Sequence, residues 1–192
     1  MAASTMQNRH DTHSTTANGA WTTKRIAVTA LFCAATVILS FVEIPIFPPA
    51  AWLKYDPSGV ICAIAGLTFG PGMGVLVSVL SWCIHFVFTG DIYGTLMAIV
   101  AMLCYVVPAA LIYKANTTMR GAIVGLVAGS VLAVVACCAA NIVITPLYTA
   151  VSASDVIAMI VPILLPFNLI KVAINSIVTV LVYKPVSKAL GA

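Results

Sequence analysis

The sequence predicts an all-α membrane protein with six transmembrane helices and little polypeptide outside the bilayer. Hydrophobic residues make up 62% of the 192 residues, whereas Asp, Glu, Lys and Arg together make up only 7%. A soluble domain carries roughly 25% charged residues, so this chain has too few charges to cover a water-exposed surface. One transmembrane helix uses about 20 apolar residues, and the hydrophobic content suffices for about six. The same composition excludes a disordered chain, a nucleic-acid-binding domain and a disulfide-rich secreted protein.

The chain divides into a polar tail and a transmembrane domain. Residues 1–23 are rich in Ser, Thr, Asn and His, which is typical of a disordered cytoplasmic tail. Residues 24–192 are expected to form one six-helix domain. Its first apolar stretch follows Lys24 and Arg25 and reaches Ile44, about 19 residues. That length exceeds the apolar core of a cleaved signal peptide and indicates a first transmembrane helix.

Prolines and glycines set the remaining boundaries. Residues 45–57 are rich in proline and are predicted to form a structured extracellular loop. The elements expected after it are a short helix over 58–69, a tight turn at 70–74, helices over 75–88, 92–113 and 121–144, and a sixth helix from 166 to about 183. Thr145 and Pro146 are expected to end the fifth helix, and Pro162 and Pro166 to interrupt the apolar region before the sixth.

The charges predict the orientation. Six helices place both termini on one side, where the tails and loops hold seven cations and one acid; the opposite side holds one cation and four acids. The first group is Arg9, Lys24, Arg25, Lys114, Arg120, Lys184 and Lys188 with Asp11, and the second is Lys54 with Glu43, Asp56, Asp91 and Asp155. Because cytoplasmic loops collect Lys and Arg, both termini are predicted to be cytoplasmic and the proline-rich loop to be extracellular.

Lys171 is the ninth cation and lies inside the sixth helix, near its outer end. Asn168 precedes it by three residues, so both side chains share one helix face. An ammonium group inside a transmembrane helix usually faces a partner or a cavity. A functional role for this pair is therefore favoured over the alternative, in which Lys171 extends to the outer membrane surface.

Further polar side chains are predicted at the outer ends of helices. Asn141, Thr145 and Tyr148 follow one stripe of the fifth helix, although Pro146 blurs the register at Tyr148. Asn141 is equally typical of a helix–helix hydrogen bond. His85 lies with Trp82 in the outer half of the third helix, where packing is the more common role for a single residue.

Together with the loop residues, these side chains offer amide, ammonium and carboxylate groups beside aromatic surface. Such a mixture suits a small molecule with a flat apolar part and several hydroxyl or amide groups. The sequence holds neither a metal-ligand spacing among its six cysteines nor a nucleophile–base pair, so no metal site and no enzyme activity are expected. The candidate ligand-binding residues from this pattern are Lys54, Tyr55, Asp56, His85, Asn141, Thr145, Tyr148, Asn168 and Lys171.

Small residues mark two helix faces. The first helix carries Ala27, Ala30 and Ala34, and the fifth begins with Gly121, Gly125 and Gly129 at intervals of four. Small residues let helix backbones approach closely in a membrane. Packing within the chain is the default for both faces, and a partner interface is the alternative that spacing alone cannot separate from it.

From residue 24 to about residue 190 the chain resembles the riboflavin-specific substrate-binding subunits (S components) of energy-coupling-factor (ECF) vitamin transporters. The segments that carry the resemblance are Leu53 to Asp56, Phe69 to Gly74, Ala140 and Asn141 with Thr145 to Tyr148, and, most strongly, Leu165 to Lys171.

The resemblance implies a function. Such subunits have six helices, bind the vitamin near the outer face and rely on a transmembrane coupling protein and two cytoplasmic ATPases. By resemblance, Asn141, Asn168 and Lys171 match positions that bind riboflavin. The resemblance also implies that residues 52–56, with Trp52 among them, and the outer end of the third helix line the flavin pocket. Ala30 and Ala34 match the motif that docks the coupling protein. The implied location is the prokaryotic cell membrane, riboflavin is the transported ligand, and no cofactor is expected.

Three alternatives remain at this point. One keeps the architecture but changes the vitamin. Another is a self-sufficient secondary transporter, which predicts inverted repeats and broken helices with ion sites at the membrane midplane. A purely structural membrane protein is a third reading.

Overall fold

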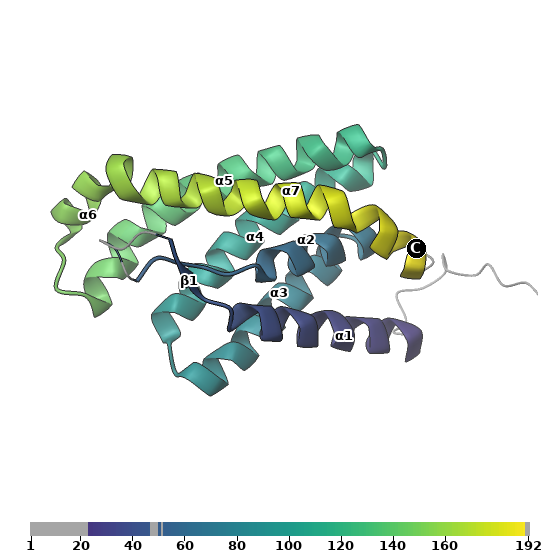
Figure 1. The fold of residues 1–192 in the computed structure, drawn as a ribbon, viewed down its shortest axis with the longest axis horizontal. Coiled ribbons are helices and arrows are strands. Elements are labelled where there is room, and N and C mark those ends of the chain that lie inside the picture. Colours follow the sequence, from purple (N-terminus) through teal and green to yellow (C-terminus); the bar gives the residue numbers. More distant parts are fainter. Residues whose placement is uncertain (1–22, 47–49, 51, 191–192) are drawn as a thin grey trace, which may run out of the picture.

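The structure is a bundle of helices with one short hairpin (Figure 1). The computed structural model describes residues 23–46, 50 and 52–190, so the predicted polar tail lies outside the described residues except for Thr23. The elements are α1 (Thr23–Ser40), β1 (Ile44–Pro45), β2 (Lys54–Tyr55), α2 (Ser58–Phe69), α3 (Pro71–Thr89), α4 (Ile92–Ala115), α5 (Met119–Tyr148), α6 (Ala153–Met159), the π-helix η2 (Ile160–Leu164) and α7 (Leu165–Leu190).

Within the described residues, five helical segments are long and apolar enough to cross a membrane: α1, α3, α4, α5 and the continuous stretch Ala153–Ala189. α2 has only 12 residues, which gives about 18 Å. It packs against α1, α3, α4 and α7, and nearly all of its residues are buried. A helix that is apolar on every side is stable only when neighbours surround it, which explains its central place.

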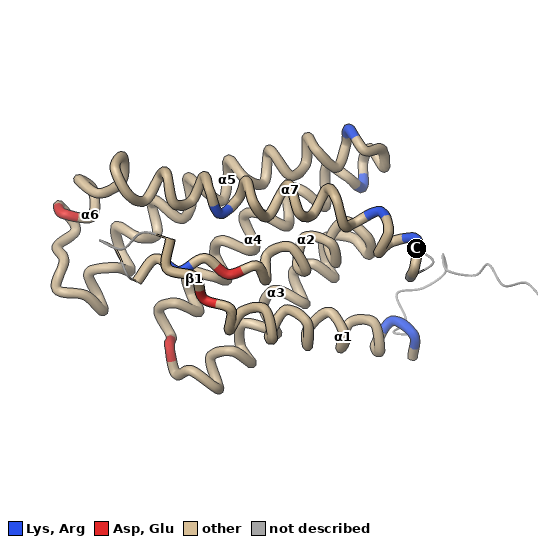
Figure 2. Tube along the Cα trace, viewed as in Figure 1, with Lys and Arg blue, Asp and Glu red and all other residues tan. Residues whose placement is uncertain are grey.

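The charges separate toward the two ends of the bundle (Figure 2). Most Lys and Arg residues gather at the end that holds the start of α1 and the end of α7, whereas the acidic residues lie toward the other end. The two ends of the described chain thus lie on the same side of the bundle, as Figure 1 also shows. The predicted segregation of cations from acids is therefore present in the fold.

The predicted proline-rich loop, residues 45–57, is described only in part, because residues 47–49 and 51 lie outside the described residues. β1 and β2 pair antiparallel, with Ile44 opposite Tyr55 and Pro45 opposite Lys54. The prediction that the first helix reaches Ile44 is wrong, because α1 ends at Ser40 and Ile44 belongs to the hairpin. β2 is followed almost directly by α2, which begins at Ser58.

Two predicted helix boundaries, the start of α3 and the end of α5, differ from the structure, and both lie near a proline. The predicted turn at 70–74 is a single residue, Gly70, which has a φ of 91°. Pro71 then begins α3 directly, because the fixed φ of proline suits the first position of a helix. Pro146 likewise does not end α5, which continues to Tyr148, since a proline near a helix end removes only one hydrogen bond.

The region before the sixth predicted helix is also helical. Pro162 lies inside η2, a wide helical turn that leads from α6 into α7. A π-turn accommodates a residue that breaks the regular hydrogen-bond ladder, so the chain stays helical past Pro162 and Pro166. The predicted interruption is therefore wrong, and it is replaced by a local change of helical register just before Asn168 and Lys171.

The glycines of α5 serve packing within the chain. A Cβ atom at Gly125 would lie 2.6 Å from the backbone oxygen of Ala109, and one at Gly129 would lie 2.1 Å from that of Tyr105. α5 thus rests directly on the backbone of α4, the close approach that small residues permit in a membrane.

Gly129→Ala should therefore destabilise the protein by about 1–3 kcal/mol, the usual effect of overpacking against a backbone that cannot move aside. Gly72→Ala is the matched control, because nothing lies within 4 Å of a Cβ atom there. Thermal unfolding of the detergent-purified variants measures the difference. Equal melting temperatures for the two variants would contradict the close α4–α5 contact.

Candidate functional site

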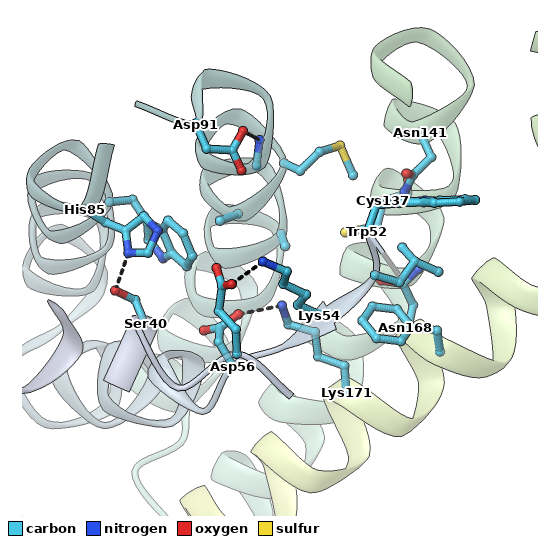
Figure 3. A pocket seen from close by; sticks show the side chains of 18 of the residues that line it. Ser40, Trp52, Lys54, Asp56, His85, Asp91, Cys137, Asn141, Asn168 and Lys171 are labelled. Carbon is cyan, nitrogen blue, oxygen red and sulfur yellow. Dashed lines mark hydrogen bonds and ion pairs between the residues drawn. The ribbon is translucent and has the colours of Figure 1, made fainter. Parts of the chain in front are cut away.

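A cavity of about 310 Å³ opens between the hairpin and the helices at the acidic end of the bundle (Figure 3). Its walls come from the end of α1, the hairpin region, α3, α4, α5 and α7. Small-molecule pockets measure roughly 300–1,000 Å³, so the volume falls in the range of a ligand site. In Figure 3, His85 and Ser40 lie on one side of the cavity, Asn141, Trp52 and Asn168 on the other, and the charged residues between them.

A buried ion pair forms the floor of this site. Nζ of Lys171 donates to Oδ2 of Asp56 at 2.8 Å, and only 14% and 6% of the two side chains are exposed. Oδ1 of Asp56 accepts hydrogen bonds from the backbone nitrogen of Ser58, at 3.2 Å, and from its hydroxyl group. The pair therefore joins the start of α2 to α7 and neutralises the ammonium that sequence analysis singled out.

A second ion pair lies at the mouth. Lys54 on β2 pairs with Glu43, which precedes β1. The side chains are 49% and 35% exposed, so water screens this pair far more than it screens Lys171 and Asp56. Asp91 also lines the cavity, where its carboxylate accepts a hydrogen bond from the backbone nitrogen of Gly94 at 2.9 Å and caps α4.

Two buried asparagines supply the amide groups. Nδ2 of Asn141 donates to the carbonyl of Cys137, and Nδ2 of Asn168 donates to that of Leu164, both at 2.8 Å. Oδ1 of Asn141 accepts from Thr145 at 2.8 Å. A carboxamide has two N–H donors and an oxygen with two lone pairs, so each amide is held in one orientation while keeping hydrogen-bonding capacity for a ligand.

Aromatic rings line the α3 side. The His85 ring lies 4.7 Å from that of Trp82 and 4.8 Å from that of Phe41, measured between centroids. Nδ1 of His85 and the hydroxyl of Ser40 are hydrogen-bonded at 2.7 Å, which ties α3 to the end of α1. Tyr148 lines the cavity from α5 and stacks on Tyr93 of α4, with the ring centroids 5.2 Å apart.

The structure brings most of the sequence-predicted site residues together, although they come from distant segments. Those that line the cavity are Trp52, Lys54, Asp56, His85, Asn141, Tyr148, Asn168 and Lys171. Tyr55 and Thr145 are not among the lining residues. The Tyr55 hydroxyl donates instead to Asn175 at 3.1 Å, and the Thr145 hydroxyl donates to Asn141. Both residues therefore hydrogen-bond to other side chains and do not face the cavity. Burial raises the pKa of the Tyr55 phenol, and the charge of Asp56 raises it further.

Sequence reasoning missed several lining residues. Ser40 lines the cavity from the end of α1, Glu43 from the segment before β1 and Asp91 from the turn between α3 and α4. Gly94, Ala98 and Ala101 line it from α4. Their spacing of four and three residues marks one helix face, and this stripe of small residues was the one signal available in the sequence.

The small-residue face of α1 lies away from this cavity. Ala27, Ala30 and Ala34 are exposed, and the last two line an apolar groove with Leu80 and Ile84 of α3. This face therefore contacts no other part of the described chain closely enough to be covered.

Comparison with known proteins identifies the family of this chain. The family model for the substrate-specific component of ECF transporters matches residues 24–183. The chain belongs to this family. Its members are substrate-binding components of transporters rather than enzymes, and the matched region makes this chain a multi-pass membrane protein.

Several relatives of this S component have been described. The chain is 29% identical over 170 residues to the riboflavin transporter RibU of Staphylococcus aureus, covering 84% of this chain and 89% of that protein. It is 30% identical over 179 residues to RibU of Streptococcus thermophilus, covering 88% and 85%. A solved structure of the S component of a bacterial ECF transporter superposes with a TM-score of 0.76 at 27% identity, covering 88% of this chain and 98% of that one.

The two ion pairs predict different effects on stability. Asp56→Ala leaves a buried ammonium without its carboxylate, which should lower the free energy of unfolding by about 3–5 kcal/mol. Glu43→Ala breaks the exposed pair and should change it by about 0–1 kcal/mol. Melting temperatures of the ligand-free variants in detergent measure the contrast, and similar losses for both would show that Asp56 and Lys171 are not a buried pair.

Proposed function

We propose that the chain is the riboflavin-binding subunit of an ECF transporter and that its cavity holds the vitamin before uptake. The observation that carries the proposal is that Asn141, Asn168 and Lys171 line one cavity together with the aromatic pair Trp82 and His85. The relatives named riboflavin transporters support the choice of ligand.

The chemistry of riboflavin matches this wall. Its ring system is flat and apolar on its faces, and its edges and hydroxylated chain are polar. Aromatic side chains suit the ring faces, while amide and ammonium groups suit the ring edge and the hydroxyl groups. Because Asn141 and Asn168 are held by hydrogen bonds to their own helices, little ordering remains to oppose binding.

We further propose that the domain spans the membrane six times and that both termini lie in the cytoplasm. The short helix α2 is then a membrane span in addition to the five long helical segments. The gathering of Lys and Arg at one end of the bundle supports this orientation, because cytoplasmic segments collect cations. The cavity and the hairpin then face the cell exterior in a prokaryotic cell membrane. Residues 1–23 form a polar cytoplasmic tail in this proposal.

The partners follow from the family. In this proposal the energy for uptake comes from other subunits. A transmembrane coupling protein and two cytoplasmic ATPases drive the uptake cycle. The exposed alanines of α1 and the groove beside them supply a surface on which another helix can pack closely. We assign Ala27, Ala30 and Ala34 to the coupling-protein interface.

Ligand identification tests the proposal most simply. Protein purified in detergent should be yellow or should quench the fluorescence of added riboflavin. A colourless protein that leaves riboflavin fluorescence unchanged would exclude riboflavin as the ligand and favour another vitamin. Uptake without any ATPase partner would favour the self-sufficient transporter.

Lys171→Ala and Asn168→Ala should each weaken riboflavin binding by about 10- to 100-fold, because each removes a hydrogen-bonding group worth roughly 1.5–3 kcal/mol. Fluorescence quenching gives the dissociation constants. Ser154→Ala is a matched control, since Ser154 is an exposed residue of α6 outside the cavity. Unchanged affinity in both cavity variants would place the ligand elsewhere.

Ala30→Trp should spare riboflavin binding and abolish uptake, because the indole fills the α1 surface without reaching the cavity. Binding by the purified variant and uptake by cells that contain the whole transporter measure the two effects. Val124→Trp, on the exposed side of α5, controls for adding a bulky side chain to the lipid-facing surface. Loss of binding and uptake in equal measure would contradict the interface assignment.

A further inference from the structure

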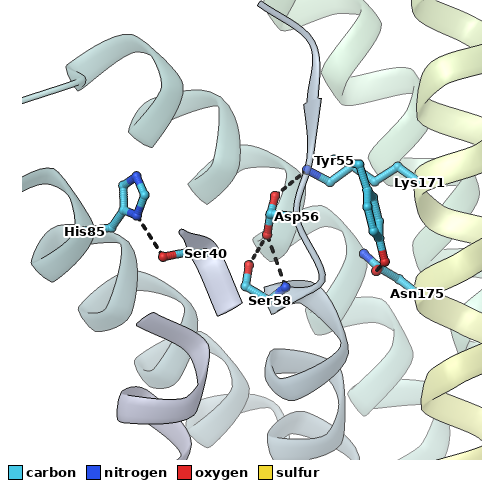
Figure 4. A network of polar contacts seen from close by, with 7 residues as sticks. All are labelled: Ser40, Tyr55, Asp56, Ser58, His85, Lys171 and Asn175. Carbon is cyan, nitrogen blue, oxygen red and sulfur yellow. Dashed lines mark hydrogen bonds and ion pairs between the residues drawn. The ribbon is translucent and has the colours of Figure 1, made fainter. Parts of the chain in front are cut away.

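The Asp56 carboxylate has partners on both of its oxygens (Figure 4). Oδ1 accepts from the backbone nitrogen and hydroxyl of Ser58, and Oδ2 accepts from Nζ of Lys171 at 2.8 Å. The side chain is only 6% exposed. Asp56 therefore lies in the cavity wall with its hydrogen-bonding capacity directed toward the protein.

Lys171 retains donors for the cavity. An ammonium group has three N–H donors, and Asp56 accepts from one of them. Lys171 lines the cavity, and 14% of its side chain is exposed. The ammonium is thus fixed on one side by the carboxylate and open on the other.

We infer that Asp56 is a positioning residue that acts on the ligand through Lys171 and does not contact the ligand itself. It holds the ammonium at one place in the wall and cancels its charge, so that Lys171 presents N–H donors to an uncharged ligand. The inference deepens the proposed function and rests on it.

Preorganisation gives the direction of the effect. A free lysine side chain samples many rotamers, and ordering it when the ligand arrives reduces affinity. The ion pair provides that order in advance. Loss of Asp56 would release the ammonium and weaken binding even though Lys171 remains.

Asp56 could also act by attaching the loop to α7, but a second hydrogen bond makes that attachment without Asp56. The Tyr55 hydroxyl donates to Oδ1 of Asn175 at 3.1 Å, and Asn175 lies one helical turn beyond Lys171 on α7. The same loop segment is therefore tied to α7 independently of Asp56. Loss of the Asp56 charge leaves this attachment in place.

The test is a double-mutant cycle on riboflavin affinity, with Asp56→Asn, Lys171→Met and the double variant. Asparagine retains an oxygen that can accept from Ser58 but turns an N–H₂ group toward Lys171, which cannot accept. Asp56→Asn should weaken binding by about tenfold in the wild-type background. In the Lys171→Met background the same change should alter the dissociation constant by less than about twofold, because the residue through which Asp56 acts is gone.

Two variants complete the design. Asp155→Asn removes a carboxylate of α6 that lies outside the cavity. It should bind riboflavin within about twofold of wild type. Asp56→Glu keeps a carboxylate near Lys171 and should recover part of the affinity. If Asp56→Asn alone does not fold, equal affinities of Lys171→Met and the double variant still support the inference.

Two results would overturn it. Equal weakening in both backgrounds would mean that Asp56 touches the ligand or acts on the fold alone. Tighter binding by Asp56→Asn would mean that the carboxylate competes with the ligand for Lys171. Failure of the wild-type protein to bind riboflavin would overturn the proposed function and this inference with it, whereas an additive cycle in a protein that binds riboflavin would overturn this inference only.

Discussion

The ion pair between Lys171 and Asp56 is the interaction on which the cavity end of the molecule depends. An ammonium inside a transmembrane helix is unfavourable by at least about 2.5 kcal/mol unless it finds a partner. Asp56 supplies that partner from the loop between α1 and α2, while its other oxygen binds the start of α2. One carboxylate thus fixes a loop, a helix start and a helix side chain together. The cavity lies directly against this junction, so its floor is rigid before any ligand arrives.

Close backbone packing leaves room for the cavity at one end of the bundle. Gly125 and Gly129 let α5 rest on α4, and α2 begins only at Ser58, so that none of its residues lines the cavity. The wide turn η2 then changes the register of the last helix just before Asn168 and Lys171. Small residues and an irregular turn therefore serve the same result, which is a polar space enclosed by apolar helices. The apolar groove beside α1 is a separate, exposed hollow. The proposed ligand site and the proposed partner surface therefore lie on different faces.

Much of this arrangement could be predicted from the sequence, because it follows from composition and local chemistry. The helix over 58–69 was predicted with its observed bounds, since Pro57 and Gly70 flank an unbroken apolar run. Lys171 was recognisable because a charge inside an apolar helix is conspicuous. The predicted helix end at Pro146 and the predicted interruption at Pro162 are wrong. A helix can continue past a proline when only one hydrogen bond is lost or when a π-turn absorbs the change. The pairing of Lys171 with Asp56 joins residues 115 positions apart, and spacing along the chain carries no information on such a contact.

The structure of the protein with bound riboflavin tests the central claim most directly. The account predicts the flavin inside the cavity, with its polar atoms within about 3.5 Å of Asn168 and Lys171. Asp56 should still hold the ammonium and should make no contact with the ligand. A flavin bound on another face, or one in the cavity that leaves both side chains without a contact, would contradict the account.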